Sequence, residues 1–253
     1  MPDTLRIDRM PMTRYAELIA STPVILPIGA TEQHGPHLPL GTDALCVTAI
    51  ADLVGAASGA LVAPTLSYGS RSVPRSGGGE EFPGTTGLSL NTVVANLTEL
   101  LDQFADDGAR HVCVLSGHYE NTAAIHEASF QVTARRTDLK VVTVLWPDLL
   151  TPQTLRKVYP EDLEYPGLDL EHAAFLETSV MMHLYPDLVD LDLAPSAGLA
   201  AFPPYDVYPT PAGLVPSSGC LAPSTGSSAD AGKAIISECV TGIASVITNE
   251  LGQ

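Results

Sequence analysis

Two short apolar runs in this chain each end in a cluster of side chains that can bind metal ions. Pro23–Ile28 is followed by Gly-Ala-Thr-Glu-Gln-His-Gly-Pro-His (29–37), and the run 110–117 is followed by His118-Tyr119-Glu120. Each run has the length and composition of a buried strand. Parallel strands of an α/β sheet end at one edge, where such proteins bind ligands, so we expect the two clusters to meet there.

The spacing within the clusters suits metal coordination. Glu32 and His34 are two residues apart, and His118 and Glu120 repeat that spacing. In an extended segment such residues point to the same side, so both members of a pair can reach one centre. A lone histidine in such a place is commonly a polar turn residue, and a lone glutamate a helix cap. Two pairs at one edge of a sheet favour a metal site.

Asp43 brings the number of candidate ligands to five, close to the start of a predicted helix. One ion needs only three or four protein ligands, and three of these five are carboxylates. The set therefore favours two divalent ions that share a bridging carboxylate. Because no cysteine is among the candidates, we expect Zn²⁺ or Mn²⁺ in a reactive centre rather than a structural zinc site.

Strand and helix patterns alternate along the rest of the chain. This alternation predicts an α/β fold, with a mostly parallel sheet flanked by helices on both faces. No repeat or long linker divides the sequence, so we expect a single domain over residues 1–253. The predicted strands are Pro23–Ile28, Ala60–Pro64, His111–Leu115 and Lys140–Leu145, and the predicted helices are Asp43–Ala57, Leu90–Asp107, Glu120–Arg136, Glu171–Leu184 and Ala229–Glu250.

Two long segments, 70–87 and 195–228, are rich in glycine, serine and proline and fit neither pattern. Loops of that length are usually functional or mobile, so both are candidates for covering an active site. Ser76 and the three glycines after it could bring backbone amides close to a ligand, although a flexible loop is the simpler alternative. No Gly-Lys-Ser/Thr follows, which excludes a phosphate-binding loop of that type.

Charge and hydropathy exclude several classes of partner. The formal net charge of −17 offers no basic stripe for nucleic acid or anionic membranes. The apolar runs fall short of the ~18 residues that span a bilayer. The first residues lack the basic and then apolar pattern of a signal peptide, so we expect a cytoplasmic protein. The four cysteines form no CxxC pair and are expected to be free.

Three further residues are candidates for chemistry. His172, next to Glu171, would open a helix near the metals and could act as a general acid or base. Glu171 could instead cap that helix. Trp146, the single tryptophan, ends a predicted strand and could belong either to the core or to a substrate platform. The histidines without a partner pattern are interpreted as surface or helix residues: His37, His111, His126 and His183.

At these positions the chain resembles the creatininase (creatinine amidohydrolase) family. The matching stretches run through most of the sequence, and two of them contain the five candidate ligands. They are LPIGATEQHGPHLPLGTD (26–43), SGGGEEFPGTTGL (76–88), GHYENT (117–122), EHAAFLETSVMMHLYPDLVDLD (171–192) and FPPYDVYP (202–209).

The resemblance implies an α-β-α sandwich that acts as a two-metal amidohydrolase. Glu32, Asp43 and His118 would hold one ion. His34, Asp43 and Glu120 would hold the other, so that Asp43 bridges the pair and Glu120 belongs to the catalytic centre.

The same resemblance implies roles for residues around the metals. His172, oriented by Glu171, matches the family's proton-transfer histidine. Tyr119 and Trp146 match positions that line the substrate pocket, and residues 76–79, Ser76, Gly77 and Gly78 among them, would offer main-chain contacts to substrate. The family assembles as a homohexamer.

One position departs from the family pattern. A tryptophan that closes over substrate in creatininase corresponds here to Leu168, which can exclude water but cannot stack on a planar ring. The resemblance as a whole implies hydrolysis of a cyclic amide, with creatinine and water giving creatine. Leu168 keeps open a related amidohydrolase acting on a formamido-pyrimidine or another small amide. Outside this class stands a non-catalytic protein that binds metal or a small molecule.

Overall fold

The computed structural model describes residues 5–161, 163–196 and 198–252, and is built around a parallel sheet of four strands. The strands are β1 (Val24–Ile28), β2 (Leu61–Val62), β3 (His111–Ser116) and β4 (Lys140–Leu145), in the order β2-β1-β3-β4. Ile28 pairs with Ser116, which in turn pairs with Leu145. The carboxyl ends of the three longer strands are therefore level, and the segments that follow them share one edge.

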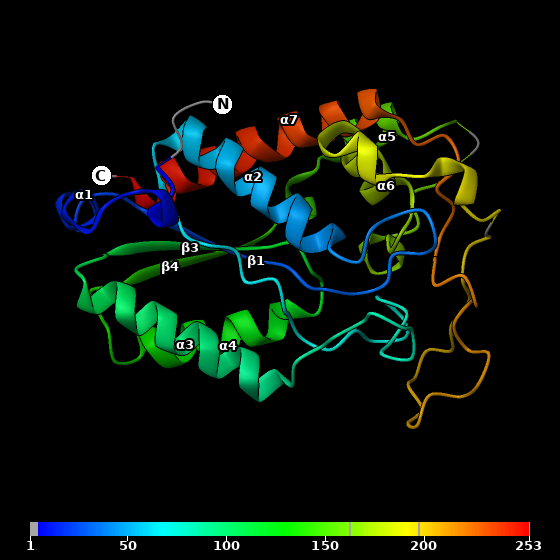
Figure 1. Ribbon diagram of the computed structural model, residues 1–253, viewed down its shortest axis with the longest axis horizontal. Coiled ribbons are helices and arrows are strands. Elements are labelled where there is room, and N and C mark those ends of the chain that lie inside the picture. The colour runs from blue at the N-terminus through cyan, green and yellow to red at the C-terminus, as the bar shows by residue number, and fades with distance from the viewer. Residues whose placement is uncertain (1–4, 162, 197, 253) are drawn as a thin grey trace.

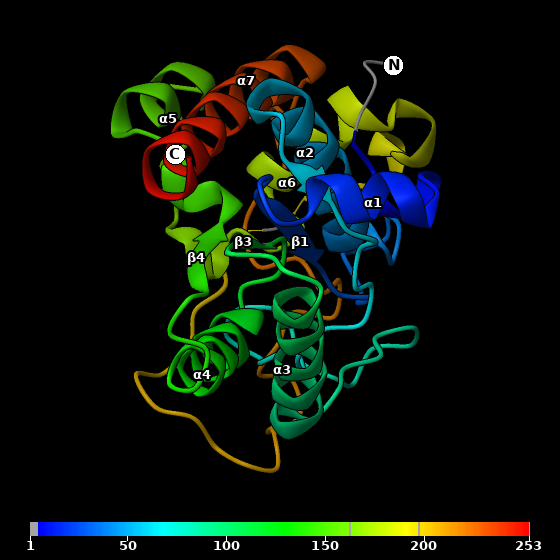
Figure 2. The same cartoon turned by 90° about the vertical axis from the view of Figure 1, so that its left-hand side faces the viewer.

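Helices cover both faces of the sheet, as the sequence predicts (Figure 1). On one face lie α2 (Thr42–Ser58), α6 (Phe175–Leu184) and α7 (Ala229–Val246), and on the other lie α3 (Leu90–Asp106) and α4 (Asn121–Thr133). Figure 2 shows the same layers with the sheet between them. Two short helices, α1 (Met12–Leu18) and α5 (Pro152–Val158), were not expected, because neither is long enough to show a clear period.

The side chains on the two faces of the sheet belong to two separate hydrophobic clusters. Ile25 and Leu115 pack with α2, α6 and α7, whereas Leu26 and Val114 pack with α3 and α4. Successive residues of a strand point to opposite faces, so a strand covered on both sides must be apolar throughout. All five residues of β1 are buried, which explains why its sequence shows no alternation.

Most predicted elements are confirmed to within a few residues, but the predicted start of the helix at Glu171 is wrong. A 3₁₀ turn over Leu168–Leu170 comes first, Ala173 has a positive φ of 53°, and α6 begins only at Phe175. A left-handed backbone at a non-glycine residue cannot continue a right-handed helix. His172 therefore lies in an irregular segment in front of the helix.

Glycines at the ends of two strands bring α2 close to the sheet. A Cβ on Gly29 would lie 2.5 Å from the backbone nitrogen of Ala44, and one on Gly117 would lie 2.6 Å from the carbonyl oxygen of Asp43. Only residues without a side chain permit this approach. The first turn of α2, which contains Asp43, is thereby held directly against the carboxyl ends of β1 and β3.

Helix α7 continues into a π-helical turn, Ile247–Leu251. The 23 residues from Ala229 to Leu251 would be long and apolar enough to cross a membrane by composition alone. In the fold, however, Ile235, Ile236 and Cys239 belong to the core shared with α2 and α6. This composition is also typical of a core helix of a soluble protein.

Candidate metal centre

Asp43 lies between the two histidines that follow β1 and β3. Its Oδ1 is 3.1 Å from Nε2 of His34, and its Oδ2 is 3.0 Å from Nδ1 of His118. Oε1 of Glu32 lies 3.2 Å from the same nitrogen of His118. The two oxygens of Asp43 thus face two different nitrogens, which is the arrangement that a bridging carboxylate needs.

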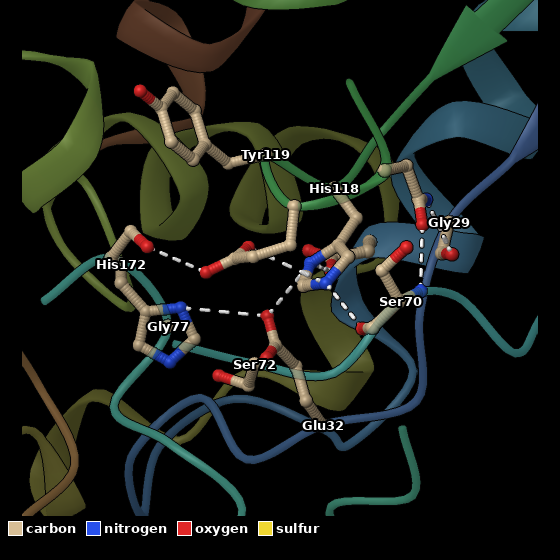
Figure 3. Close-up of polar contacts among 12 residues, drawn as sticks. Gly29, Glu32, Ser70, Ser72, Gly77, His118, Tyr119 and His172 are labelled. Carbon is tan, nitrogen blue, oxygen red and sulfur yellow. Dashed lines mark hydrogen bonds and ion pairs between the residues drawn. The ribbon is translucent and has the colours of Figure 1, made fainter. Parts of the chain in front are cut away.

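Backbone carbonyls orient both imidazole rings. Nε2 of His118 lies 3.0 Å from the carbonyl oxygen of Ser70, and Nδ1 of His34 lies 3.2 Å from that of Glu32. A carbonyl only accepts, so each of these nitrogens carries the ring proton. The other nitrogen of each ring faces the carboxylates and becomes available to a metal ion when it loses its proton, which is the orientation of metal-ligating histidines. Figure 3 shows His118 held between Glu32 and Ser70.

Several atoms at the centre are buried and lack partners. Oε2 of Glu32, Nε2 of His34 and Oδ2 of Asp43 make no hydrogen bond of acceptable geometry with the described residues, although the last two lie close to ligand atoms of their neighbours. Buried polar groups are seldom left in this condition without an ion or a functional role. Carboxylate oxygens and imidazole nitrogens are hard or borderline ligands for cations, so these residues fit divalent metal ions.

The electrostatics of the site support the same interpretation. Burial raises the pKa of Glu32 to about 7. Burial lowers the pKa of His118, but Glu32 and Glu120 outweigh it and raise that pKa well above its ordinary value. The same balance, with Glu177 and Asp43 as the carboxylates, raises the pKa of His34. Without metal the carboxylates retain protons on the rings, and divalent cations could replace these protons.

The structure adds a candidate ligand for the second ion. The groups that could hold ions include Glu32 with Asp43 and His118, and His34 with Asp43 and Glu177. Oε2 of Glu177, in the first turn of α6, lies 3.5 Å from Nε2 of His34. Glu177 is therefore a candidate ligand beside His34, and the expectation that Glu120 binds the second ion stays a prediction. Sequence reasoning missed it because no second ligand stands next to it in the chain.

Glu120 lies on the other side of His118. Its Oε1 accepts hydrogen bonds from the hydroxyl of Ser76 at 2.6 Å and the backbone amide of Val73 at 3.1 Å, and its Oε2 lies 3.4 Å from Nε2 of His118. These contacts fix the carboxylate beside His118. They also connect the loop that contains Ser76 to the site.

A cavity with about 450 Å³ of empty volume, including its open mouth, leads to these carboxylates. Four of the predicted substrate residues line it, whereas Gly77 and Gly78 do not and instead pack against Ser72, Glu32 and Gln33. The lining residues from the prediction are Ser76, Tyr119, Trp146 and Leu168. Trp146 is also part of the core, and its role as a substrate platform stays a prediction.

The expected contact between Glu171 and His172 is absent from the described hydrogen bonds. Glu171 accepts hydrogen bonds from the hydroxyl of Tyr159 and from the backbone amide of Leu176, so it caps α6. Burial raises its pKa to about 8. The polar neighbour of His172 is Gln33, whose Nε2 lies 2.7 Å from Nε2 of the ring. Burial, together with the nearby His34, lowers the pKa of His172 well below its ordinary value.

His37 also differs from its prediction as a surface or helix residue. It is buried, and its Nε2 lies 3.0 Å from the hydroxyl of Thr178. It therefore supports α6, the helix that contains Glu177, rather than facing solvent.

Comparisons with known proteins agree with this site. The Creatininase family model, described as creatinine amidohydrolase, matches residues 8–247. The chain belongs to the creatininase family. Creatinine amidohydrolase of Pseudomonas putida is 40% identical over 234 residues, which cover 90% of this chain and 89% of that protein. Mycofactocin precursor peptide peptidase of Mycolicibacterium smegmatis is 30% identical over 230 residues, with 87% and 82% covered.

Solved creatininase structures share the whole fold. A mutant creatininase complexed with creatine superimposes with a TM-score of 0.96 at 36% identity, covering 99% of this chain and 100% of that one. A mutant of zinc–zinc type and a manganese form match with TM-scores of 0.95 and 0.96, at the same identity and coverage. Creatininase structures thus occur with the two metals that the donor set of this chain favours.

Proposed function

We propose that this protein is a metal-dependent amidohydrolase that opens a cyclic amide, with creatinine and water as substrates and creatine as product. One observation carries the proposal: two ligand groups share Asp43 at the base of a cavity lined by Tyr119 and Trp146. The cavity leads from the surface to both ligand groups, which gives a small amide access to the ions that they would hold. The similarity to creatinine amidohydrolase of Pseudomonas putida supports the choice of substrate.

The ligands divide between two divalent ions, Zn²⁺ or Mn²⁺. Glu32, Asp43 and His118 would hold one, and His34, Asp43 and Glu177 the other. When bound, such ions lower the pKa of a coordinated water to near neutrality and polarise the amide carbonyl. Asp43 would contribute one carboxylate oxygen to each of the two groups, since its Oδ1 faces His34 and its Oδ2 faces His118.

Other residues of the chain position the substrate and move its proton. Hydrolysis adds the oxygen of water to the carbonyl carbon and a proton to the ring nitrogen as the carbon–nitrogen bond breaks. His172 lines the cavity and is the candidate to hold the proton that the ring nitrogen receives. Trp146 and Leu168 exclude water from the ring, and Tyr119, 46% exposed, lies at the mouth.

A second candidate within the same class follows from Leu168. It lines the cavity where an aromatic lid would stack on a planar ring, so it relaxes the preference for creatinine. The relative from Mycolicibacterium smegmatis, a peptide peptidase, suits a scaffold that accepts other amides. Formamido-pyrimidines and other small amides are therefore the alternative substrates.

The test is hydrolysis by protein loaded with zinc or manganese, assayed with creatinine beside a panel of formamides and short peptide amides. Release of creatine, abolished by a chelator and restored by either metal, is the expected result. Hydrolysis of another amide with no turnover of creatinine would select the alternative substrate. Tight metal binding without turnover of any amide would overturn the proposed enzyme.

Assembly and location extend the proposal. We infer a homohexamer in the cytoplasm, supported by the family resemblance and by exposed aromatic residues such as Tyr205 and Tyr208 that a subunit contact could cover. Light scattering of the purified protein measures its oligomeric state. A monomer at micromolar concentration would contradict it.

A further inference from the structure

Gln33 lies between two candidate metal ligands in the sequence, Glu32 and His34, but its side chain contacts His172. Its Oε1 accepts a hydrogen bond from the backbone amide of Gly35 at 2.9 Å. Its Nε2 lies 3.0 Å from the carbonyl oxygen of Gly219, 3.3 Å from that of Gly77 and 2.7 Å from Nε2 of His172. The side chain is 94% buried, since only 6% of its surface is exposed.

The partners of this amide fix which end is nitrogen. A backbone N–H can only donate, and a backbone carbonyl can only accept. Turning the amide over would place its oxygen against the carbonyls of Gly77 and Gly219 and its NH₂ against the N–H of Gly35. All three contacts would then be repulsive, so the NH₂ group must face His172. Its two hydrogens are directed at the carbonyl oxygen of Gly219, at 3.0 Å, and at Nε2 of His172, at 2.7 Å, and the carbonyl oxygen of Gly77, at 3.3 Å, is a weaker third acceptor.

Glycines close the slot around this amide. A Cβ on Gly219 would lie 1.9 Å from Oε1 of Gln33, and one on Gly78 would lie 2.7 Å from its Nε2. Both glycines have positive φ and belong to the two long covering segments. The backbone therefore approaches the amide from two sides and leaves it no room to rotate.

The orientation of Gln33 determines the tautomer of His172. If Nε2 of the ring carried a hydrogen, two donors would face each other at 2.7 Å. Nε2 must therefore accept, and the single proton of the neutral ring lies on Nδ1. That nitrogen lies 3.7 Å from Oε1 of Glu32, on the side of the metal centre. Figure 3 shows one ring nitrogen directed at Glu32 and the other turned away from the cluster.

We propose that Gln33 is a positioning residue that holds His172 as its Nδ1–H tautomer, with that N–H presented to the catalytic cavity. The distinction matters because His172 with Glu32 and His34 also forms a group that could hold an ion. A nitrogen that carries a proton has no lone pair for a metal, so Gln33 keeps His172 as a hydrogen-bond and proton donor. This functional role rests on the proposed amidohydrolase activity, whereas the tautomer does not.

The decisive measurement is the tautomer itself. Zinc-loaded protein labelled with ¹⁵N in its histidine rings gives long-range ¹H–¹⁵N correlations that distinguish Nδ1–H, Nε2–H and the doubly protonated ring. The signals of His172 are assigned by their loss in His172→Asn. We expect Nδ1–H in the wild type. A wild-type ring protonated on Nε2, or with Nδ1 bound to zinc, would overturn the proposal whatever amide the enzyme hydrolyses.

Two variants of similar size test the part played by Gln33. Gln33→Glu replaces the donor by an acceptor and should transfer the His172 proton to Nε2. Gln33→Met removes both functions and should leave a mixture of tautomers. Gln153→Glu makes the same charge change on an exposed position of α5 and should leave the His172 spectrum unchanged. An unaltered tautomer in Gln33→Met would show that Gln33 does not set it.

Activity provides an independent measure. Changes to groups that orient a metal-site histidine typically cost 10–100-fold, so we expect kcat of Gln33→Met to fall by ~10–100-fold. A positioning role predicts a fall in kcat with little change in KM and with two ions still bound. Loss of metal together with an unchanged tautomer would instead make Gln33 a support for its neighbours Glu32 and His34, and would contradict the proposal.

Discussion

Oε2 of Glu177 lies 3.5 Å from Nε2 of His34, and this contact joins the first turn of α6 to the segment that follows β1. The second ion of the proposed centre therefore depends on a helix far along the chain. Glu177→Ala should lower the metal content from two ions to one per chain, because the group around His118 keeps its own ligands. Elemental analysis after dialysis measures this. Glu99→Ala, on the exposed side of α3, is the control, and two ions retained in Glu177→Ala would remove Glu177 from the ligand set.

Asp43 is common to both ligand groups, so its loss should affect both ions. Asp43→Ala is expected to release both metals and to abolish essentially all amide hydrolysis. Asp43→Asn keeps the shape but gives up the negative charge, and should bind metal more weakly than the wild type. One tightly held ion in a fully active Asp43→Ala enzyme would reject the bridged pair.

His172→Ala should separate catalysis from metal binding. Neither ligand group that shares Asp43 contains His172, so two ions should remain bound. General acid–base groups contribute ~10²–10⁴-fold, and kcat should fall by that factor. Steady-state kinetics and elemental analysis on the same preparation give both quantities. If metal is lost with the ring, His172 is a ligand through Nδ1.

Leu168→Trp tests the closure of the cavity. An aromatic ring facing a planar substrate adds about 0.5–1.5 kcal/mol beyond area burial, which corresponds to a several-fold change in affinity. If creatinine is the substrate, its KM should decrease by that factor with kcat nearly unchanged. Leu168→Met, similar in size and without a ring, should leave KM close to that of the wild type. An increase in KM for Leu168→Trp would show that the leucine is fitted to a different substrate.

Glu171 should make the free energy of unfolding depend on pH. Burial raises its pKa to about 8 in the folded protein, from an ordinary value of 4.5. The folded state then binds this proton more tightly than the unfolded state. The stabilisation is complete below about pH 4.5 and is lost as the pH rises towards 8, at up to about 1.4 kcal/mol per pH unit.

Glu171→Gln removes this titration and should make the dependence less steep, leaving the part due to Glu32, whose pKa burial raises to about 7. Urea unfolding of metal-free protein across this pH range measures it without a contribution from metal release. Glu164→Gln, an exposed neighbour, should behave like the wild type. Equal pH dependence in Glu171→Gln and the wild type would contradict the raised pKa.

The fold and half of the centre could be predicted because their signals are local. The candidate pairs at 32 and 34 and at 118 and 120 each lie within a few residues of an apolar run with the length and composition of a buried strand. Parallel pairing then brings them together, and Asp43 follows at a helix start. Each of these inferences needs only a short window of sequence and one rule of topology.

The remaining contacts depend on how distant segments pack. Glu177 resembles any acidic residue in the first turn of a helix, and Gln33 resembles any polar residue in a turn. Glu171 and His172 are adjacent in sequence, yet Ala173 turns the backbone and their side chains find different partners, Tyr159 and Gln33. His37 is buried because α6 covers it, which no pattern around it indicates.

The close approach of α2 to Gly29 and Gly117 has a consequence for how the activity could be altered. Asp43 is held in place because the backbone of α2 packs directly on the backbone of Gly29 and Gly117. Leu168 and Ser76, which line the cavity, belong to segments outside the sheet. Substitutions that reshape the walls of the cavity can therefore change which amide is accepted while the ions stay in place. Alanine at Gly29 or Gly117 would do the reverse, and move the bridge by displacing a whole helix.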